Sequence, residues 1–421
     1  TEAERTVRFR WHASEQLQHL ILEDPATGEQ VTTWAFGTTL ADSGVARNDL
    51  PVAKTYPTGE SESQTYNRQS DVTGMTDPNG SVHAYDYDKL GELTSDRVPT
   101  LAEDIDGTVR RIDFAFNDQG RLGTVTSADN PSAGAGSVIN QVAFEYDSFG
   151  NTKKDSQEHD GAIDGNTPTV TYRHTDGANN ILRRIGVIVP SGKEAETAYG
   201  VGGGIDDILN RVASLRISGE TQNLVEYRYA GLGRVVKLKY PGCDTELSYL
   251  KPADFVGTGD AGDDVTAYDR FGRTVAMPWR KSSDGTAHAL IGYGYDRMSR
   301  RTFRTDAAPA ADGNFDQAFV YDPLGQVVGR QRGTLNQART NIGGIAKEAE
   351  SWNYDEQGNW LGYDLSEDGI EIVDQTRTHN RSNQIVSIDD SSISSAYDQN
   401  GNMTKVPTGG RGLEGPPVSV K

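Results

Sequence analysis

The sequence predicts an all-β fold built from repeated antiparallel β-hairpins, with few or no helices. Three observations predict it. The chain repeats one short turn motif, Tyr-Asp-x-x-Gly, along most of its length. Aromatic residues alternate along the segment before each turn, as in Phe144-x-Tyr146 and Phe319-x-Tyr321. Helix signals are scarce, and only residues 345–352, IAKEAESW, favour a short helix.

One copy of the motif, Tyr268-Asp269-Arg270-Phe271-Gly272, shows why it predicts a turn. A type I turn prefers Asp at its first position, and the residue three positions later needs a positive φ, which Gly adopts without strain. A turn of this kind, followed by a left-handed residue, closes two antiparallel strands with a β-bulge. We therefore expect Asp269 to start the turn, Gly272 to close it and the preceding aromatic rings to stack.

Six full copies supply the candidate structural residues, which share Tyr, Asp and Gly at the same spacing. They are Tyr87, Asp88, Gly91, Tyr146, Asp147, Gly150, Tyr268, Asp269, Gly272, Tyr321, Asp322, Gly325, Tyr354, Asp355, Gly358, Tyr397, Asp398 and Gly401. Nine of the 18 tyrosines precede Asp directly, whereas 39 Asp in 421 residues would give fewer than two by chance. Imperfect copies keep turn chemistry, with Asn67 in place of Asp and Asn383 in place of Gly. Such repetition indicates a building unit, not a single site.

The bulk composition narrows the functional classes. A net charge of -20 makes binding to a phosphate backbone unfavourable, so no nucleic-acid partner is expected. The sequence has no apolar run long enough to span a membrane and no recognisable signal peptide. Cys243 is the single cysteine, which excludes an internal disulfide and a Cys-x-x-Cys metal site. The chain begins at Thr1 and ends in an alternating run, so we expect a segment of a longer polypeptide.

These motifs resemble the RHS or YD-repeat family. In that family Tyr-Asp is followed by two variable residues, then by Gly, then by Arg or Asn, and then by an apolar residue. Residues 76–98 match it most closely, because they also carry an Asp-Pro-x-Gly turn at Asp77, Pro78 and Gly80. The resemblance implies an RHS/YD-repeat β-spiral, in which hairpins wind into a hollow shell or tube. In bacterial Rhs effectors, toxin-complex cocoons and teneurins, such shells surround or carry a further domain.

The domain organisation follows from where the motif recurs. Residues 1–64 are predicted to form an N-terminal β segment that continues into the spiral. The YD-repeat β-spiral spans 65–405, with a degenerate stretch or insertion at about 151–226. The Gly/Pro-rich tail, 406–421, is expected to be the truncated end of a longer chain.

No catalytic or cofactor motif stands out. The sequence lacks HExxH, GxSxG and Walker A patterns, so an enzyme is not expected, and no cofactor is predicted. The Gly-rich stretch 257–262 is interpreted as a flexible loop. Calcium is the one open alternative, at Asp260, Asp263 and Asp264, at Asp160 and Asp164, or at 202–209. Solvated acidic loops are the favoured interpretation of these clusters.

The sequence therefore predicts a non-catalytic structural segment of a larger exported or surface protein, extracellular or on a bacterial cell surface. Its role would be to enclose, carry or display another polypeptide, a toxin-type cargo in relatives. Two alternatives stay open. Open spiral ends would allow self-assembly into a filament or tube, and recurring aromatic residues with acidic loops would suit a glycan- or calcium-dependent adhesin.

Overall fold

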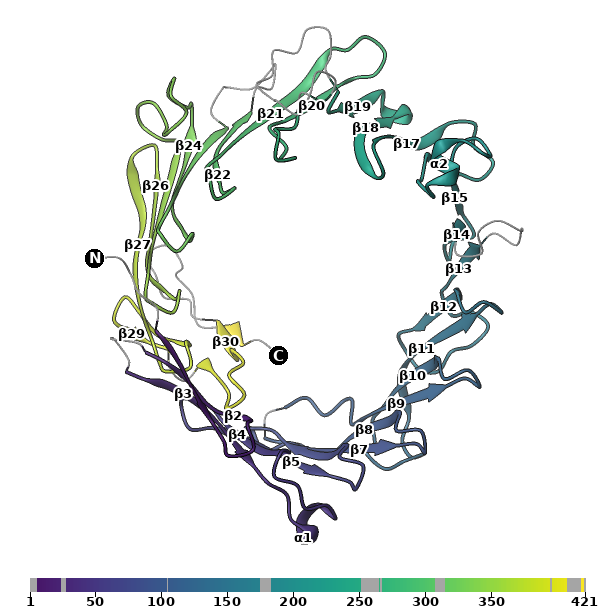
Figure 1. Cartoon of the computed structure of the whole chain (residues 1–421), viewed down its shortest axis with the longest axis vertical. Coiled ribbons are helices and arrows are strands. Elements are labelled where there is room, and N and C mark those ends of the chain that lie inside the picture. The colour runs from purple at the N-terminus through teal and green to yellow at the C-terminus, as the bar shows by residue number, and fades with distance from the viewer. Residues whose placement is uncertain are drawn as a thin grey trace.

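The computed structural model describes residues 6–23, 28–103, 105–174, 183–250, 265, 267–306, 315–393, 396–406 and 418–419. It confirms the predicted all-β fold. Twenty-nine strands form one antiparallel sheet, and the two short strands β30 and β31 form a second. Figure 1 shows the large sheet curving into a ring. Among the described residues the helices are single turns.

The first strands of the sheet cover the N-terminal third of the chain. They are β1 (Val7–Trp11), β2 (Leu17–Leu22), β3 (Gln30–Phe36), β4 (Pro51–Thr55), β5 (Ser61–Tyr66), β6 (Val72–Thr76), β7 (Val82–Tyr87), β8 (Leu93–Thr100), β9 (Arg111–Phe116) and β10 (Leu122–Ala128). Helix α1 (Leu40–Ser43) lies in the connection between β3 and β4.

The middle and last strands continue in the same way. They are β11 (Val138–Tyr146), β12 (Thr152–Glu158), β13 (Thr169–His174), β14 (Arg184–Ile188), β15 (Glu194–Ala198), β16 (Ser214–Ile217), β17 (Asn223–Ala230), β18 (Arg234–Tyr240), β19 (Thr245–Ser248), β20 (Ala276–Lys281), β21 (Ala287–Tyr295), β22 (Arg301–Asp306), β23 (Asp316–Tyr321), β24 (Val327–Gly333), β25 (Glu348–Tyr354), β26 (Trp360–Glu367), β27 (Ile370–His379), β28 (Ile385–Ile388), β29 (Ser391–Ser392), β30 (Lys405–Val406) and β31 (Val418–Ser419). Helix α2 (Ile205–Ile208) lies between β15 and β16, and the short helix η1 (Pro241–Cys243) between β18 and β19.

Each strand from β1 to β28 pairs antiparallel with the next strand in sequence. The register shifts by a bulge at the last residue before several corners, for example at Tyr146, Tyr295 and Tyr354. Bulges bend a strand and increase its twist, so a repeated bulge provides a repeated bend. The sheet is thus a meander that curves in one direction.

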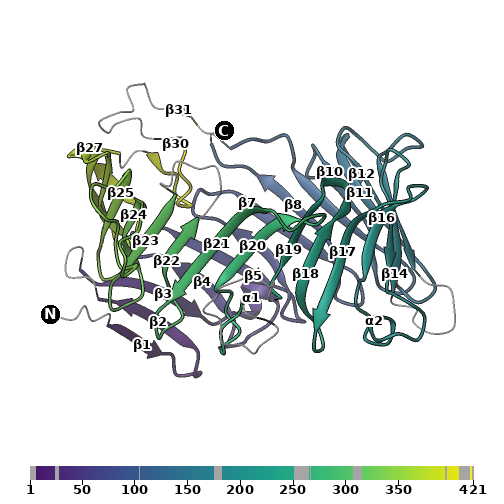
Figure 2. The same ribbon diagram turned by 90° about the horizontal axis from the view of Figure 1, so that it is seen from above.

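The connections fall on two rims of the ring because all neighbouring strands are antiparallel. We call the edge formed by connections from an odd-numbered strand to the following even-numbered strand the corner rim. It includes residues 88–92, 117–121, 147–151, 231–233, 296–300, 322–326, 355–359 and 380–384. The opposite rim carries the remaining connections, such as 56–60, 77–81, 189–193 and 282–286. Figure 2 shows the strands running obliquely between the two rims.

The wall has no solid hydrophobic core. No large side chain among the described residues is less than 2% exposed. Buried apolar residues are scattered around the ring, as Ile21, Val236, Leu247 and Ile388 illustrate. Cross-strand ion pairs fill part of the surface, including Arg97–Asp86 and Arg330–Glu350. A single sheet wetted on both faces needs few large apolar side chains, which explains the modest apolar content of the sequence.

The helix predicted at 345–352 is wrong, because Glu348–Tyr354 is strand β25. Its even-numbered residues share one face of the sheet. There Glu348 and Glu350 form ion pairs with Arg330 and Arg332 of β24. Partners on the neighbouring strand therefore override the local helix signal.

The stretch 151–226, where the sequence motif fades, contains β12 to β16 and part of β17 in the same meander. The segment 257–262 and the candidate calcium residues Asp260, Asp263 and Asp264 lie outside the described residues. Within the part of the chain that the structure describes, no helix is long and apolar enough to cross a membrane.

Candidate functional site

The corner at residues 269–273 shows the geometry of the repeated motif. The backbone N–H of Gly272 donates to the carbonyl of Asp269 at 2.9 Å, and Asp269 N–H donates to the carbonyl of Arg273 at 2.9 Å. The Oδ1 atom of Asp269 accepts hydrogen bonds from the N–H groups of Phe271 and Arg273, each at 2.9 Å. Its Oδ2 atom binds Nε of Arg273 at 2.6 Å. One carboxylate thus accepts two backbone N–H groups of the turn and orients the side chain of the residue after the glycine.

The other predicted corners are built in the same way. Every corner glycine has a positive φ: 84° at Gly91, 86° at Gly150, 77° at Gly272, 88° at Gly325, 88° at Gly358 and 85° at Gly401. The backbone N–H of the residue four positions after Asp88, Asp147, Asp322, Asp355 and Asp398 donates to the carboxylate at 2.8–2.9 Å. Ser70, Ser299 and Asn383 adopt the same left-handed conformation where Gly is missing. The predicted residues therefore lie apart along the corner rim and do not converge on one cleft.

Corner tyrosines connect each hairpin to the one before it. Their hydroxyls donate to a backbone carbonyl just after the preceding corner. The bonds run from Tyr87 to Val72 (2.8 Å), Tyr146 to Leu122 (2.8 Å), Tyr268 to Val235 (3.3 Å), Tyr295 to Thr274 (2.8 Å), Tyr321 to Arg301 (2.8 Å) and Tyr354 to Val327 (2.8 Å). Burial raises the pKa of Tyr321 and Tyr354 above the ordinary tyrosine value. Among the described residues, no ring contact joins the corner tyrosines of successive repeats.

The arginine after the glycine makes a second connection, to the hairpin that follows. Arg273 lies over the ring of Tyr295, 4.8 Å from its centroid, and Arg300 lies at the same distance over Tyr321. Their Nη1 atoms donate to the carbonyls of Asp296 and Asp322, at 3.1 and 3.0 Å. Cation–π contacts of this kind contribute about 0.5–1 kcal/mol at exposed sites. Arg121, Arg211 and Arg234 lie over Tyr146, Tyr229 and Tyr268 in the same way.

The corner glycine also leaves room for the arginine that reaches over from the preceding corner. A Cβ atom on Gly150 would lie 1.5 Å from Nη1 of Arg121, and one on Gly272 would lie 2.6 Å from Nη2 of Arg234. Around Gly91, by contrast, no atom lies within 4 Å of the Cβ position. Glycine is therefore required at some corners by its neighbour as well as by its φ.

Sequence reasoning missed these connections between hairpins. The recurrence of a basic or amide residue after the glycine was visible, but a local pattern does not show which neighbouring hairpin that residue reaches. The targets of the tyrosine hydroxyls are backbone carbonyls, which leave no signature in the side-chain sequence. The motif thus combines a local turn with two contacts that order hairpins along the sheet.

A second group of contacts joins the end of the circuit to its beginning. Asn79 Nδ2 donates to Asp398 Oδ2 at 3.0 Å, and Asn400 Nδ2 donates to Asp77 Oδ2 at 2.8 Å. Asn400 N–H also donates to Asn79 Oδ1 at 3.0 Å, across 321 residues. We call this set, with the contacts in the next paragraph, the overlap seam.

Three further bonds extend the overlap seam. Gln357 Nε2 donates to the carbonyl of Glu23 at 2.9 Å, the hydroxyls of Thr58 and Ser382 lie 2.8 Å apart, and Gln30 Nε2 donates to Asn383 Oδ1 at 2.9 Å. Together the seam contacts span 319 to 353 residues. In each case the corner rim of the later segment lies on the opposite rim of the earlier one. The last strands thus begin a second coil on the first, where the connections after β25 and β27 bond to the region of β2 and β3 (Figure 1).

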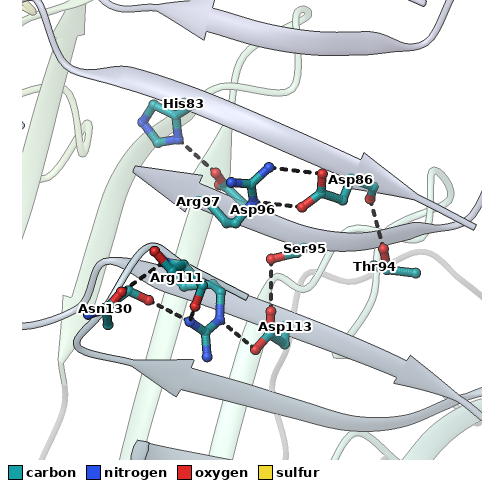
Figure 3. A network of polar contacts seen from close by, with 10 residues as sticks. His83, Asp86, Thr94, Ser95, Asp96, Arg97, Arg111, Asp113 and Asn130 are labelled. Carbon is teal, nitrogen blue, oxygen red and sulfur yellow. Dashed lines mark hydrogen bonds and ion pairs between the residues drawn. The ribbon is translucent and has the colours of Figure 1, made fainter. Parts of the chain in front are cut away.

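A polar network on β7, β8 and β9 contains a histidine, a serine, arginines and carboxylates (Figure 3). His83 Nδ1 lies 2.9 Å from Asp96 Oδ1, and this hydrogen bond raises the pKa of His83. Ser95 donates to Asp113 at 2.8 Å, and Asp113 binds Arg111 Nε at 2.8 Å.

The two halves of this network lie on opposite faces of the sheet. Asp96 pairs with Tyr85, whereas Ser95 pairs with Asp86 and Asp113. His83 and Ser95 are therefore separated by the sheet and do not form a nucleophile–base pair. Arg111, which is 6% exposed, donates to the carbonyls of Asn130 at 2.6 Å and Ala135 at 3.0 Å and so holds the loop between β10 and β11. Its role is structural.

Three of the candidate calcium residues that the structure describes have protein partners for their carboxylates. Asp206 and Asp207 form ion pairs with Arg211 and Arg183. Asp164 Oδ1 accepts from Asn166 N–H at 2.8 Å. Across the described ranges, no group of three or more His, Cys, Asp or Glu residues is arranged to hold a metal ion.

The sequence matches no family model and no curated protein. Solved structures do match the fold. The chain aligns with the crystal structure of TcdB2-TccC3-TEV at 13% identity and a TM-score of 0.58, covering 94% of this chain and 21% of that one. TcdB2-TccC3 without its hypervariable C-terminal region aligns at 14% identity and a TM-score of 0.62, covering 95% and 20%. The Photorhabdus luminescens Tc holotoxin pore with a mutated TccC3 aligns at 12% identity and 0.57, covering 95% and 21%.

These neighbours are toxin-complex shells, and this chain spans about a fifth of their length. At such low identity, the likeness concerns the fold. It agrees with the Tyr-Asp corners, the single meandering sheet and the ring that overlaps itself. The chain therefore has the fold of the RHS/YD-repeat shells, an open β-spiral of corner hairpins.

Proposed function

We propose that this chain is a non-catalytic wall segment of a larger extracellular or surface-exposed bacterial shell that encloses, carries or displays another polypeptide. The observation that carries the proposal is the complete circuit of the sheet, which returns to stack on its own beginning at the overlap seam. A single curved sheet without a solid core is suited to surround a volume, not to bind a ligand within itself. The toxin-complex shells with the same fold support this role.

The distribution of contacts supports the same role. Corner tyrosines such as Tyr295 connect a hairpin to the previous one, and at several corners an arginine such as Arg273 connects it to the next. Such nearest-neighbour contacts stabilise an extended repeat array. We propose that residues 1–405 act as one continuous spiral in which the corner residues are architectural.

The shape can be tested on the chain itself. Negative-stain images and solution scattering are expected to show a ring with an open centre. A variant with Asn79→Ala and Asn400→Ala, which removes contacts of the overlap seam, is the matched comparison and should give a more open outline. An extended strip or a solid globule for the unaltered chain would contradict the proposed wall.

Enclosure needs a separate test. An unstructured polypeptide joined after Lys421 is expected to be cleaved more slowly by a protease than the same polypeptide free in solution. The seam variant carrying the same extension should lose part of this protection. Equal cleavage rates for the joined and the free polypeptide would contradict enclosure, even where imaging confirms the ring.

A further inference from the structure

The corner rim carries a row of exposed apolar side chains at one position of the repeat. The residue just before the closing Gly or Ser is apolar and exposed in six corners. These residues are Leu90 (82%), Phe149 (59%), Leu232 (82%), Phe271 (69%), Met298 (66%) and Leu324 (46%). We call them the tip residues. Surface leucines are common singly, but apolar residues recurring at one position of a repeat mark an interaction surface.

Other connections on the same rim add to this row. Leu40 of α1 is 71% exposed, and Val201, Ile205 and Ile208 around α2 are 82%, 66% and 72% exposed. Both helices lie in connections from an odd-numbered to an even-numbered strand, so they belong to the corner rim. The apolar row therefore follows the rim from residue 40 to residue 324.

The overlap seam shows what the tip position does when another coil lies against it. The equivalent residues of the last three corners are Gln357, Ser382 and Asn400, all polar. Each forms a hydrogen bond with the opposite rim of the first coil, to Glu23, Thr58 and Asn79. The tip is thus the point at which one coil meets the next. Where the chain itself supplies a second coil, the tips are polar and bonded. Among the other corners, six tips are apolar and exposed, and Ser14, Gln69 and Gln119 are polar.

The opposite rim is complementary to the apolar row. At or beside its connections lie the exposed apolar residues Ile105 (40%), Val189 (39%), Leu224 (49%), Ile345 (74%) and Ile370 (67%). It is also acidic, with Asp160, Glu220, Asp284 and Asp368 exposed. On the corner rim, the residue before the tip is an exposed basic side chain at Lys89, Arg270 and Arg297. Both rims therefore carry exposed apolar residues, and the basic residues of the corner rim are complementary in charge to the acidic residues of the opposite rim.

We propose that the corner rim of one copy of this chain docks onto the opposite rim of a second copy, head to tail. The contact continues the overlap seam, in which these two rims already pack within one chain. Each copy carries both halves of the interface, but at different ends, so the contact is heterologous and extends into a stack of rings. The tip residues would then be buried between copies.

Oligomeric state tests the proposal. Sedimentation velocity over a dilution series is expected to show dimers and longer stacks of the unaltered chain as concentration rises. A corner-rim variant with Leu90→Gln, Phe149→Gln and Met298→Gln should sediment as a monomer at every concentration. The matched control is Val320→Thr, because Val320 is 56% exposed but belongs to strand β23 and not to a connection on either rim. An unaltered chain that stays monomeric throughout, or a control that dissociates like the rim variant, would overturn the proposal.

A mixing experiment determines the polarity of the contact. An opposite-rim variant with Ile345→Gln and Ile370→Gln should also be monomeric alone. Mixed with the corner-rim variant, it should form a one-to-one pair, because each variant retains the rim that the other has lost. A contact between two corner rims would instead leave the opposite-rim variant dimeric alone and give no mixed pair, and that result would contradict a head-to-tail stack. Urea unfolding of both variants, with midpoints unchanged, shows that association and not folding is lost.

Discussion

Corners in two regions of the ring use one backbone turn for different contacts. At 269–273 and 296–300 the residue after the closing position is an arginine, which lies over the next corner tyrosine. At 355–359 and 398–402 it is an asparagine, which binds the turn carboxylate as the arginines do. Asn359 reaches the next corner through a hydrogen bond to Asn383 and not through a tyrosine ring. The tips differ too, since Phe271 and Met298 are exposed whereas Gln357 and Asn400 are bonded across the overlap seam.

The difference separates two tasks within the motif. The residue after the glycine, together with the tyrosine, determines how a hairpin contacts its neighbours along one coil. The tip residue determines how that hairpin contacts another coil. Asp and Gly are common to both regions because both need the same turn. A sequence position in this repeat can therefore be assigned to contacts along the coil or between coils.

Acidification is expected to have the broadest effect, because it acts on both kinds of corner. Burial raises the pKa of Asp147, Asp269, Asp296, Asp322 and Asp398, but hydrogen bonds to each carboxylate lower it by more, so every net pKa lies below the ordinary value. A carboxylate with a lowered pKa stabilises the fold at pH values above the ordinary pKa of about 4. This stabilisation is lost as the pH falls through the pKa of the folded state.

We therefore expect the urea midpoint to stay level near neutral pH and to fall steeply below about pH 4. Tryptophan fluorescence would follow the transition. A variant with Asp269→Asn, Asp296→Asn and Asp322→Asn should be less stable at neutral pH and less sensitive to acid. A midpoint that rises on acidification in the unaltered chain would contradict this account of the corners.

Gly272→Val is expected to have the largest effect of any single substitution. Valine at φ +77° costs about 1–2 kcal/mol or more in backbone strain. Its side chain would also displace Arg234, which lies 4.8 Å from the centroid of the Tyr268 ring. Gly91→Val is the matched control, because its φ is +84° but its surroundings are open. Equal losses of unfolding free energy in the two variants would show that the arginine contact contributes nothing.

Tyrosine hydroxyls provide a comparison between the two regions. Tyr295→Phe and Tyr354→Phe each remove a 2.8 Å bond to a backbone carbonyl, and each should lower the free energy of unfolding by about 1 kcal/mol. Tyr293→Phe is the control two residues earlier, since its hydroxyl has only a 3.7 Å contact with Met277. Its effect should be close to zero. A loss at Tyr293 equal to that at Tyr295 would mean that the hydroxyl bond between hairpins is not the cause.

The overlap seam is expected to give the smallest effect, because its bonds are largely exposed. A double-mutant cycle of Asn79→Ala and Asn400→Ala should give a coupling free energy of about 0.5–1 kcal/mol in urea unfolding. The control cycle pairs Asn79→Ala with Gln399→Ala, one residue before Asn400, and should show no coupling. Additive effects in the Asn79–Asn400 cycle would indicate that the coils do not touch there in solution.

The fold class and the turn geometry follow from the sequence because both are local. Tyr-Asp-x-x-Gly encodes a type I turn, a left-handed residue and a bulge within a few residues, and the alternating aromatic residues encode strands. Asn383 could be placed by analogy with the complete copies, and it adopts the same φ sign. Ser299 is a weaker signal for a left-handed residue, yet it adopts that conformation too. The local pattern failed at 348–354, where ion pairs with β24 favour a strand over a helix.

Long-range contacts were beyond the sequence pattern. The partners of Asn79 and Asn400 are 321 residues apart, and their meeting depends on the summed curvature of all the hairpins between them. Neither residue differs in type from many other turn asparagines. Likewise, the tip residues resemble ordinary turn positions in the sequence. Their position between coils becomes apparent only from the overlap seam, where the corner rim stacks on the opposite rim. Curvature, unlike a turn, is a property of the whole circuit.

Most Tyr-Asp corners have the same length whereas the connections of the opposite rim do not, and this has a consequence for how such a chain can change. Five residues separate the strands at 88–92, 147–151, 296–300, 322–326 and 355–359, while opposite-rim connections range from the short 368–369 to the long 334–347. Extra residues on the long loops leave the circumference unaltered. Adding or deleting a whole hairpin would instead rotate every later corner relative to the coil beneath it. The number of hairpins per circuit thus determines which corners stack on one another. Insertions in the opposite-rim loops would preserve this stacking, whereas a change in the number of hairpins would not.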